Sequence, residues 1–126
     1  MYCDEEGSSE TANTITSPNY PQNYPNNMDI SYPIAVNVGS TIQVDFEDLL
    51  LEDGYNCRYD WVEVVDSNEE VLLKACHISP LPSYNKYVSK TNRVTVNFHS
   101  DVSVNARGFK LTWSEIKNEI NSESAL

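Results

Sequence analysis

Three acidic side chains stand where predicted strands end. Glu52 opens the loop after an alternating segment at 41–46, and Asp60 closes that loop. Asp101 follows a second alternating segment at 94–98. Because the loops of a β-sandwich gather at its two ends, these three carboxylates can converge on one end.

Converging carboxylates repel one another unless a cation lies between them. Calcium suits such a site because it takes roughly 6–8 oxygen ligands, which backbone carbonyls around Val102 and Ser103 could complete. The pattern alone leaves an alternative open, in which the carboxylates are solvated turn residues and Asp101 only caps its own turn.

Catalytic chemistry finds little support in the sequence. A paired Asp and Glu can act as acid and base, but nothing in the sequence predicts a substrate cleft beside them. His77 and His99 are far apart and stand in no metal or nucleophile motif. No serine has a G-x-S-x-G context, so we expect no enzyme activity.

Short alternating runs separated by turn residues predict an all-β, antiparallel sandwich. The segment 14–27 contains Pro18, Pro21 and Pro25 and is predicted to be an edge strand that runs into irregular loop. Residues 41–46 are expected to return from the strand before them, and 99–109 to form a hairpin-like connection. The remaining strands are predicted at 31–38, 61–66, 71–76, 87–90, 94–98 and 109–113.

The 126 residues fit one domain, with 14–116 as its body. Residues 1–13 are expected to form a flexible acidic arm carrying Cys3, and 117–126 a polar tail or linker. No apolar run approaches the roughly 18 residues of a membrane span. No signal peptide is recognised in the acidic start, which leaves either a cytosolic chain or a mature or truncated form as the expectation.

The formal net charge is −11, from 19 acidic and 8 basic residues. Nucleic acid and anionic membranes are therefore poor partners, because like charges repel. A basic partner or a cation is favoured, although the same acidity could serve only solubility.

Three cysteines are present, and none forms a C-x-x-C pair. Cys57 and Cys76 flank a strand-like run, and their separation suits a disulfide closing a loop of roughly 20 residues. The alternative is that all three are buried thiols in a cytosolic protein.

Three motifs in order resemble the signatures of the CUB domain family. They are ITSPNYPQNYPNN at 15–27, LEDGYNCRYDWVEVVD at 51–66 and VNFHSDVSVNARGFKLTW at 96–113. The resemblance implies a two-sheet antiparallel jelly-roll sandwich from a secreted or extracellular protein. It also implies a module that binds other proteins, commonly with a calcium site at one end.

The resemblance also implies roles for individual residues. Glu52, Asp60 and Asp101 fall on the family's three acidic calcium ligands, and Ser103 on a position where a backbone carbonyl ligates. Tyr20 falls on a tyrosine that supports the acidic site. In similar domains the same three carboxylates grip a Lys or Arg of the partner protein.

The sequence departs from the family pattern at its cysteines. Cys57 and Cys76 match the second family bridge, whereas Cys3 matches half of the first, and Ile30 occupies the position of its partner. Cys3 is therefore predicted to have no partner within the domain. An alternative function follows, in which the chain is a structural or assembly module linked through Cys3 and independent of calcium.

Other departures bear on the site and its loops. Val104 stands where calcium-binding members often have a polar side chain, Tyr32 replaces a usual Trp, and the usual Gly after Cys76 is missing. Carbohydrate or small-ligand binding is a third function that the resemblance allows. It ranks last because no aromatic platform can be assigned to it.

Overall fold

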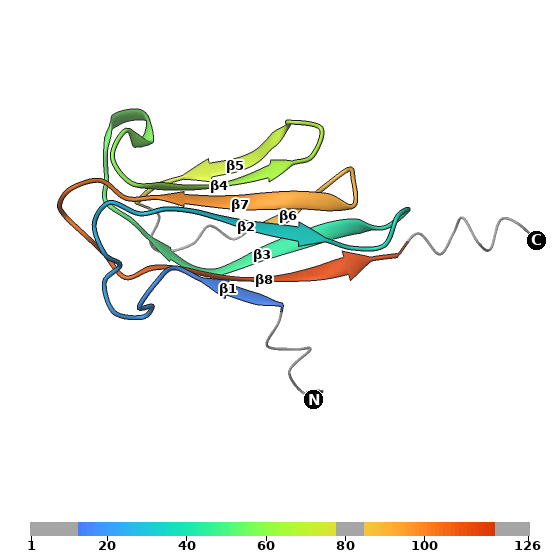
Figure 1. Cartoon of the computed structure of the whole chain (residues 1–126), viewed down its shortest axis with the longest axis horizontal. Coiled ribbons are helices and arrows are strands. Elements are labelled where there is room, and N and C mark those ends of the chain that lie inside the picture. The colour runs from blue at the N-terminus through green and yellow to red at the C-terminus, as the bar shows by residue number, and fades with distance from the viewer. Residues whose placement is uncertain (1–12, 78–84, 118–126) are drawn as a thin grey trace, which may run out of the picture.

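The computed structural model describes residues 13–77 and 85–117, which form two four-stranded antiparallel sheets packed face to face (Figure 1). The first sheet has the order β1 (Thr14–Thr16), β8 (Gly108–Ile116), β3 (Thr41–Leu50) and β6 (Lys86–Val88). The second has the order β2 (Asp29–Ala35), β7 (Arg93–His99), β4 (Trp61–Asp66) and β5 (Val71–Ala75). The predicted all-β jelly-roll sandwich is confirmed. Over these residues, no helix has the length and apolarity needed to cross a membrane.

The core lies between the two sheets. Along β3, β4 and β7, buried residues alternate with more exposed ones, because successive side chains of a strand point to opposite faces. Both sheets, the β1–β2 loop and the start of the β3–β4 loop contribute buried apolar side chains, which are Tyr24, Ile34, Ile42, Val44, Phe46, Leu49, Leu51, Val62, Val64, Ala75, Val94, Val96, Phe98, Phe109 and Leu111.

The strand β3 is longer than the sequence pattern predicted. Alternation ends at Phe46, but pairing with β8 resumes at Asp48 after a β-bulge. The extra residue shifts the phase of the alternation, so that Leu49 and Leu51 are buried instead of the even-numbered positions. The bulge carries the strand to the edge of the candidate site.

The predicted hairpin between β7 and β8 is wrong. The two strands lie in different sheets, with β7 pairing with β2 and β4 while β8 pairs with β1 and β3. The connection at 100–107 has enough residues to cross the ~10 Å between packed sheets. The prediction that 41–46 returns from the strand before it is also wrong, because β3 and β2 lie in different sheets. Their apolar faces meet across the shared core.

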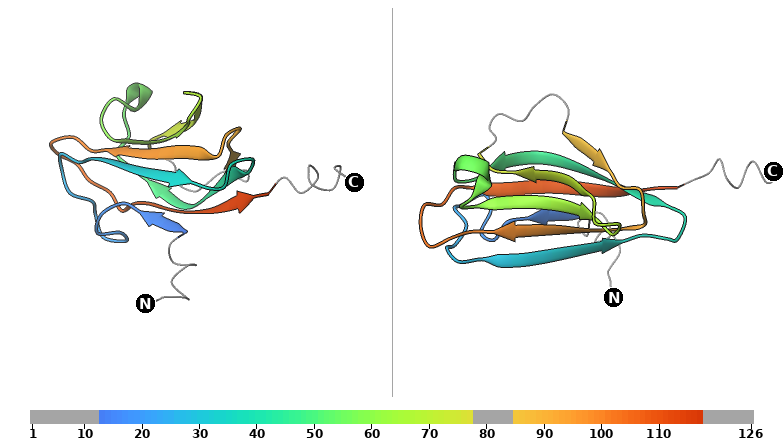
Figure 2. Two further views of the ribbon diagram at one scale, coloured as in Figure 1. Left: turned by 45° about the vertical axis from the view of Figure 1, so that its right-hand side comes forward. Right: turned by 90° about the horizontal axis from the view of Figure 1, so that it is seen from above.

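Three loops meet at one end of the sandwich, on the left of Figure 1. They are the β1–β2 loop at 17–28, the β3–β4 loop at 51–60 and the β7–β8 loop at 100–107. Figure 2 shows the same grouping in two further orientations. The sequence predicted this convergence of the loops that carry the acidic residues.

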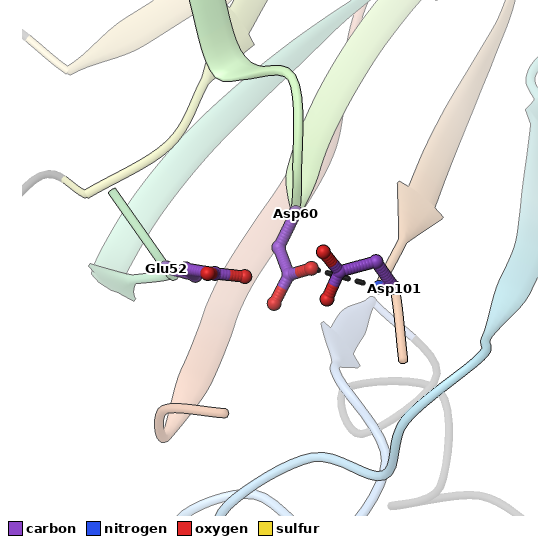
Figure 3. A group of neighbouring side chains, drawn as sticks. All are labelled: Glu52, Asp60 and Asp101. Atoms are coloured by element: carbon purple, nitrogen blue, oxygen red, sulfur yellow. Dashed lines mark hydrogen bonds between the residues drawn. The ribbon is translucent and has the colours of Figure 1, made fainter. Parts of the chain in front are cut away.

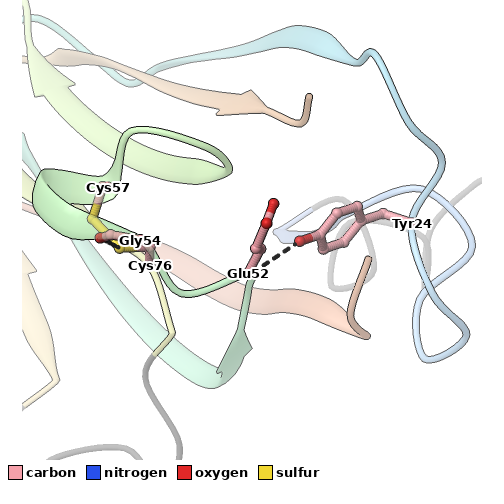
Figure 4. The surroundings of a disulfide bond; sticks show 5 residues. All are labelled: Tyr24, Glu52, Gly54, Cys57 and Cys76. Atoms are coloured by element: carbon pink, nitrogen blue, oxygen red, sulfur yellow. Dashed lines mark hydrogen bonds between the residues drawn. A yellow bond between two sulfur atoms is a disulfide. The ribbon is translucent and has the colours of Figure 1, made fainter. Parts of the chain in front are cut away.

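Cys57 and Cys76 form a disulfide, with their Cα atoms 5.5 Å apart. The bridge joins the short 3₁₀ turn η1 (Tyr55–Cys57) to the residue after β5, and so fastens the β3–β4 loop to the second sheet (Figure 4). Ile30, at the position of a family cysteine, packs against the core from β2. Cys3 lies outside the described residues. The residue after the bridge, His77, has a φ of 47°, a left-handed conformation that glycine adopts freely.

Replacing both bridged cysteines by alanine should lower the free energy of unfolding by about 3 kcal/mol, because the bridge restricts a loop of 19 residues in the unfolded chain. Urea denaturation would measure the loss. Cys3→Ser is the control and should leave stability unchanged. Disulfide mapping that finds Cys3 joined to Cys57 or Cys76 as the main species would contradict the assignment.

Candidate metal centre

Glu52, Asp60 and Asp101 come together at the loop-bearing end of the sandwich. One carboxylate oxygen from each lies within 4.8 Å of those of the other two (Figure 3). Glu52 follows the end of β3, Asp60 precedes β4 and Asp101 follows β7, so strands of both sheets position the cluster. The structure thus brings together the three residues singled out from the sequence.

Asp60 is the fixed centre of this cluster, with no exposed surface. Its Oδ1 accepts the backbone N–H of Asp101 at 2.8 Å, and its Oδ2 accepts the hydroxyl of Tyr24 at 2.6 Å. Buried carboxylates require such donors, because an unpaired buried charge is costly. These two bonds join Asp60 to both neighbouring loops.

Tyr24 supports the cluster from the β1–β2 loop, and its side chain is 1% exposed. Its ring packs edge-on against Phe98, with ring centroids 5.1 Å apart. While it donates to Asp60, its hydroxyl accepts the backbone N–H of Glu52 at 3.1 Å (Figure 4). A single hydroxyl therefore sets the spacing between two of the three acidic residues.

The supporting role predicted for Tyr20 is wrong. The hydroxyl of Tyr20 donates to Asp48 at 2.5 Å, at the β-bulge of β3, and not to a member of the cluster. The tyrosine that contacts the cluster is instead Tyr24, four residues further along the segment 17–28, and it was not singled out from the sequence. Its burial could have been suspected from the sequence only if the irregular segment had been predicted to turn inward.

The β7–β8 loop is fastened to the β1–β2 loop on both sides of Asp101. The backbone carbonyl of Asp101 accepts the N–H of Asn27 at 2.8 Å, and Ser100 Oγ donates to the carbonyl of Pro25 at 2.7 Å. Further along, Asn105 Nδ2 donates to the carbonyl of Tyr24 at 2.7 Å. The backbone around Asp101 is thus held by several hydrogen bonds.

Within that loop the backbone turns around the Asp101 side chain. The N–H of Ser103 bonds Asp101 Oδ1 at 3.2 Å. Val104 follows with a φ of 64°, a conformation that β-branched residues strongly disfavour, and its side chain is 58% exposed. The loop therefore holds a strained, exposed valine beside the acidic cluster.

A second carboxylate, Asp48, clamps the other end of the same loop. Nε and Nη2 of Arg107 each donate to one carboxylate oxygen of Asp48 at 2.7 Å, and the hydroxyl of Tyr20 donates to the same carboxylate. Such paired bonds between guanidinium and carboxylate are strong and directional. The Arg107 hydrogen bonds hold the pKa of Asp48 at about 2.

In the acidic cluster the pKa values of Glu52 and Asp60 shift upward, in the opposite direction to that of Asp48. Burial raises the pKa of Glu52, and the charges of Asp60 and Asp101 raise it further. Burial also raises the pKa of Asp60, against the opposing effect of the bonds from Tyr24 and the Asp101 N–H. The loops therefore hold three carboxylates close together at an electrostatic cost.

A family model for the CUB domain matches residues 3–113. The chain belongs to the CUB family. The family consists of non-catalytic binding modules. The two-sheet sandwich and the disulfide described above agree with this membership.

Among curated relatives, protein SpAN of Strongylocentrotus purpuratus is 42% identical over 105 residues, which cover 82% of this chain and 17% of that protein. Cubilin of Rattus norvegicus is 32% identical over 111 residues, covering 86% of this chain and 3% of cubilin. The chain therefore spans less than a fifth of the length of either relative.

Solved structures share the fold. The CUB2 domain of MASP-1, in a crystal structure described as bound to Ca²⁺, superposes with a TM-score of 0.70 at 30% identity, covering 79% of this chain and 88% of that one. The full extracellular region of zebrafish Gpr126/Adgrg6 superposes with a TM-score of 0.76 at 30% identity, covering 82% of this chain and 13% of that one. A domain of this fold has thus been crystallised with calcium.

The clamp predicts a specific pH dependence. Since the pKa of Asp48 falls on folding, from 3.8 to about 2, its contribution to stability is complete above about pH 4 and is lost as the pH falls towards 2. Asp48→Asn should cost about 1–2 kcal/mol of unfolding free energy at pH 6, and the difference from the wild type should shrink between pH 4 and 2. Chemical denaturation across this range measures it.

The neighbouring Glu47 provides the matched control for this experiment. Its ion pair with Lys110 is longer, at 3.6 Å, and both side chains are more than 40% exposed. Glu47→Gln should change stability little at any pH. A wild-type advantage over Asp48→Asn that stayed constant from pH 6 to 2 would refute the role of the clamp.

The strain at Val104 predicts a stabilising substitution. Val104→Asn should raise the free energy of unfolding by about 1 kcal/mol, because asparagine tolerates the left-handed conformation. Calcium-free thermal melting would detect the gain. Val102→Asn, at an exposed position whose φ is not positive, is the control and should give no gain. Equal effects of the two variants would contradict the assignment of strain.

Proposed function

We propose that this chain is an extracellular protein-binding module that depends on calcium. Glu52, Asp60 and Asp101 would hold one calcium ion, together with a backbone carbonyl near Ser103. The same three carboxylates would grip an exposed Lys or Arg of a partner protein. The observation that carries the proposal is the convergence of these carboxylates at the loop-bearing end.

An unsatisfied atom supports the presence of a cation. Glu52 Oε1 is buried and accepts no hydrogen bond from the described part of the chain. A buried carboxylate oxygen without a donor is unfavourable, and more so beside two further carboxylates. A cation among the three would supply the missing positive charge, so these residues fit a metal site.

The chemistry of the donors favours calcium over other metals. The cluster offers only carboxylate oxygen atoms, which calcium prefers, whereas zinc sites use mostly nitrogen and sulfur. Magnesium demands a tighter octahedral geometry and retains its waters. The calcium-bound CUB2 domain of MASP-1, which shares this fold, supports the same choice.

The charge of the chain supports a basic partner. Carboxylate lone pairs not engaged by the metal can accept short, charge-assisted hydrogen bonds from a Lys or Arg side chain. The net charge of −11 would steer a positively charged surface towards this end. No pocket is found over residues 13–77 and 85–117, which favours contact with a protein surface over enclosure of a small ligand.

The disulfide and the comparisons support an extracellular location. Disulfides persist in oxidising compartments and are rare in the cytosol. The Cys57–Cys76 bridge is built into the loop that carries Glu52 and Asp60. One of the similar structures is described as an extracellular region.

Calcium should stabilise the isolated chain modestly. Extracellular sites often have dissociation constants of roughly 10⁻⁴–10⁻³ M, so millimolar calcium would add about 0.4–1.4 kcal/mol, or a few degrees in melting temperature. Asp101→Ala should abolish this shift, since it removes a ligand but leaves the strands and disulfide intact. Thermal melting with calcium, and with magnesium for comparison, measures it.

Asp53→Asn is the matched control for the loss of a negative charge. Asp53 lies beside Glu52 in the same loop but is exposed and outside the cluster, so this variant should keep the full calcium shift. Basic proteins should bind the wild type in calcium and fail to bind Asp101→Ala. A calcium shift that survives in both Asp101→Ala and Asp60→Ala would exclude this site.

A further inference from the structure

Exposed apolar side chains are concentrated in the two loops that carry the acidic cluster. Among the described residues seven large hydrophobic side chains are exposed, and four of them lie in the two loops that carry the carboxylates: Tyr55, Tyr59, Val102 and Val104. The other three are Val38, Val71 and Val88, on other parts of the fold. Apolar residues grouped around a polar site are a feature of interaction surfaces.

On one side, the β3–β4 loop presents Tyr55, which is 78% exposed. It stands in η1, which the disulfide of Cys57 fastens to the second sheet. Tyr59 is held more firmly, because its ring packs so closely on Gly54 that a β-carbon there would clash, and the guanidinium of Arg58 lies over it. Tyr55 is thus the free aromatic ring of a constrained loop.

On the other side, the β7–β8 loop presents Val102 and Val104, which are 70% and 58% exposed. The loop is not free to bury them, because the hydrogen bonds of Asp101 and Asn105 and the Arg107 clamp fix its backbone. Val104 moreover keeps its apolar side chain outside at the cost of a left-handed backbone. Strain of this kind is concentrated at functional sites.

We infer that the partner segment of this module carries a Lys or Arg bracketed by apolar side chains. The basic side chain lies on the carboxylates, one apolar neighbour packs on Tyr55 and the other on Val102 and Val104. The inference rests on the calcium-dependent function proposed above and adds to it the sequence chemistry that the partner must have.

Charge identifies the class of partner. A second copy of this chain also carries a net charge of −11, so two acidic ends would repel each other. A basic centre with apolar flanks satisfies both parts of the surface, with charge-assisted bonds at the middle and buried apolar area around it. A chain segment of a protein supplies these groups side by side.

Two synthetic peptides test the inference directly. Both contain one central lysine, flanked on each side by leucine in the first and by serine in the second. At millimolar calcium, the leucine-flanked peptide should bind about tenfold more tightly, because only its flanking residues remove apolar surface from water. Titration followed by NMR of the labelled chain measures both affinities and locates the shifts.

Variants of the chain separate the apolar contacts from the metal. Tyr55→Ser combined with Val102→Ser should remove the advantage of leucine while leaving the calcium-induced melting shift unchanged. Val38→Ser, at the opposite end of the sandwich and 92% exposed, is the control and should preserve the advantage.

Each outcome bears on one of the two proposals. Equal affinity of the two peptides, or binding of neither although calcium shifts the melting temperature, overturns the inference about the flanking residues. Absence of any calcium shift overturns the function on which it rests.

Discussion

The loop-bearing end of this domain depends on one buried carboxylate that must be hydrogen-bonded. Asp60 has no exposed surface, so its two oxygens need donors from the protein itself. It obtains them from Tyr24 in the β1–β2 loop and from the backbone of Asp101 in the β7–β8 loop. The need to satisfy one charge therefore fixes three loops relative to one another.

The same arrangement places the Glu52 carboxylate, which lacks such donors at Oε1 within the described part of the chain, next to Asp60. Asp60 has two donors, whereas Glu52 Oε1 is buried with none among the described residues, and both pKa values are raised. The opposite holds at Asp48, where Arg107 supplies the counter-charge and the pKa falls. The Asp48–Arg107 pair carries its own counter-charge and stabilises the loops, whereas the calcium ion that we propose would relieve the repulsion among Glu52, Asp60 and Asp101.

Much of this end could be predicted from the sequence, because the acidic residues stand where alternating strands end. The sandwich, the convergence of Glu52, Asp60 and Asp101, and the Cys57–Cys76 bridge were all anticipated. Strand pairing was not, because alternation shows which face is buried but not which sheet a strand joins.

The errors at the site have a similar cause. The segment 17–28 has no regular periodicity, so nothing local indicates that Tyr24 turns into the core while Tyr20 remains near the surface. The bulge in β3 interrupts the alternation of apolar residues, so the pattern did not show that the strand continues through Asp48. Contacts between irregular segments depend on the whole fold and leave little trace in local sequence.

A crystal structure of the chain grown in millimolar calcium would test the central claim most directly. The account predicts one ion among Glu52, Asp60 and Asp101, at roughly 2.3–2.6 Å from an oxygen of each, with Glu52 Oε1 as one of the ligands. Well-ordered carboxylates with only water between them at saturating calcium would contradict it.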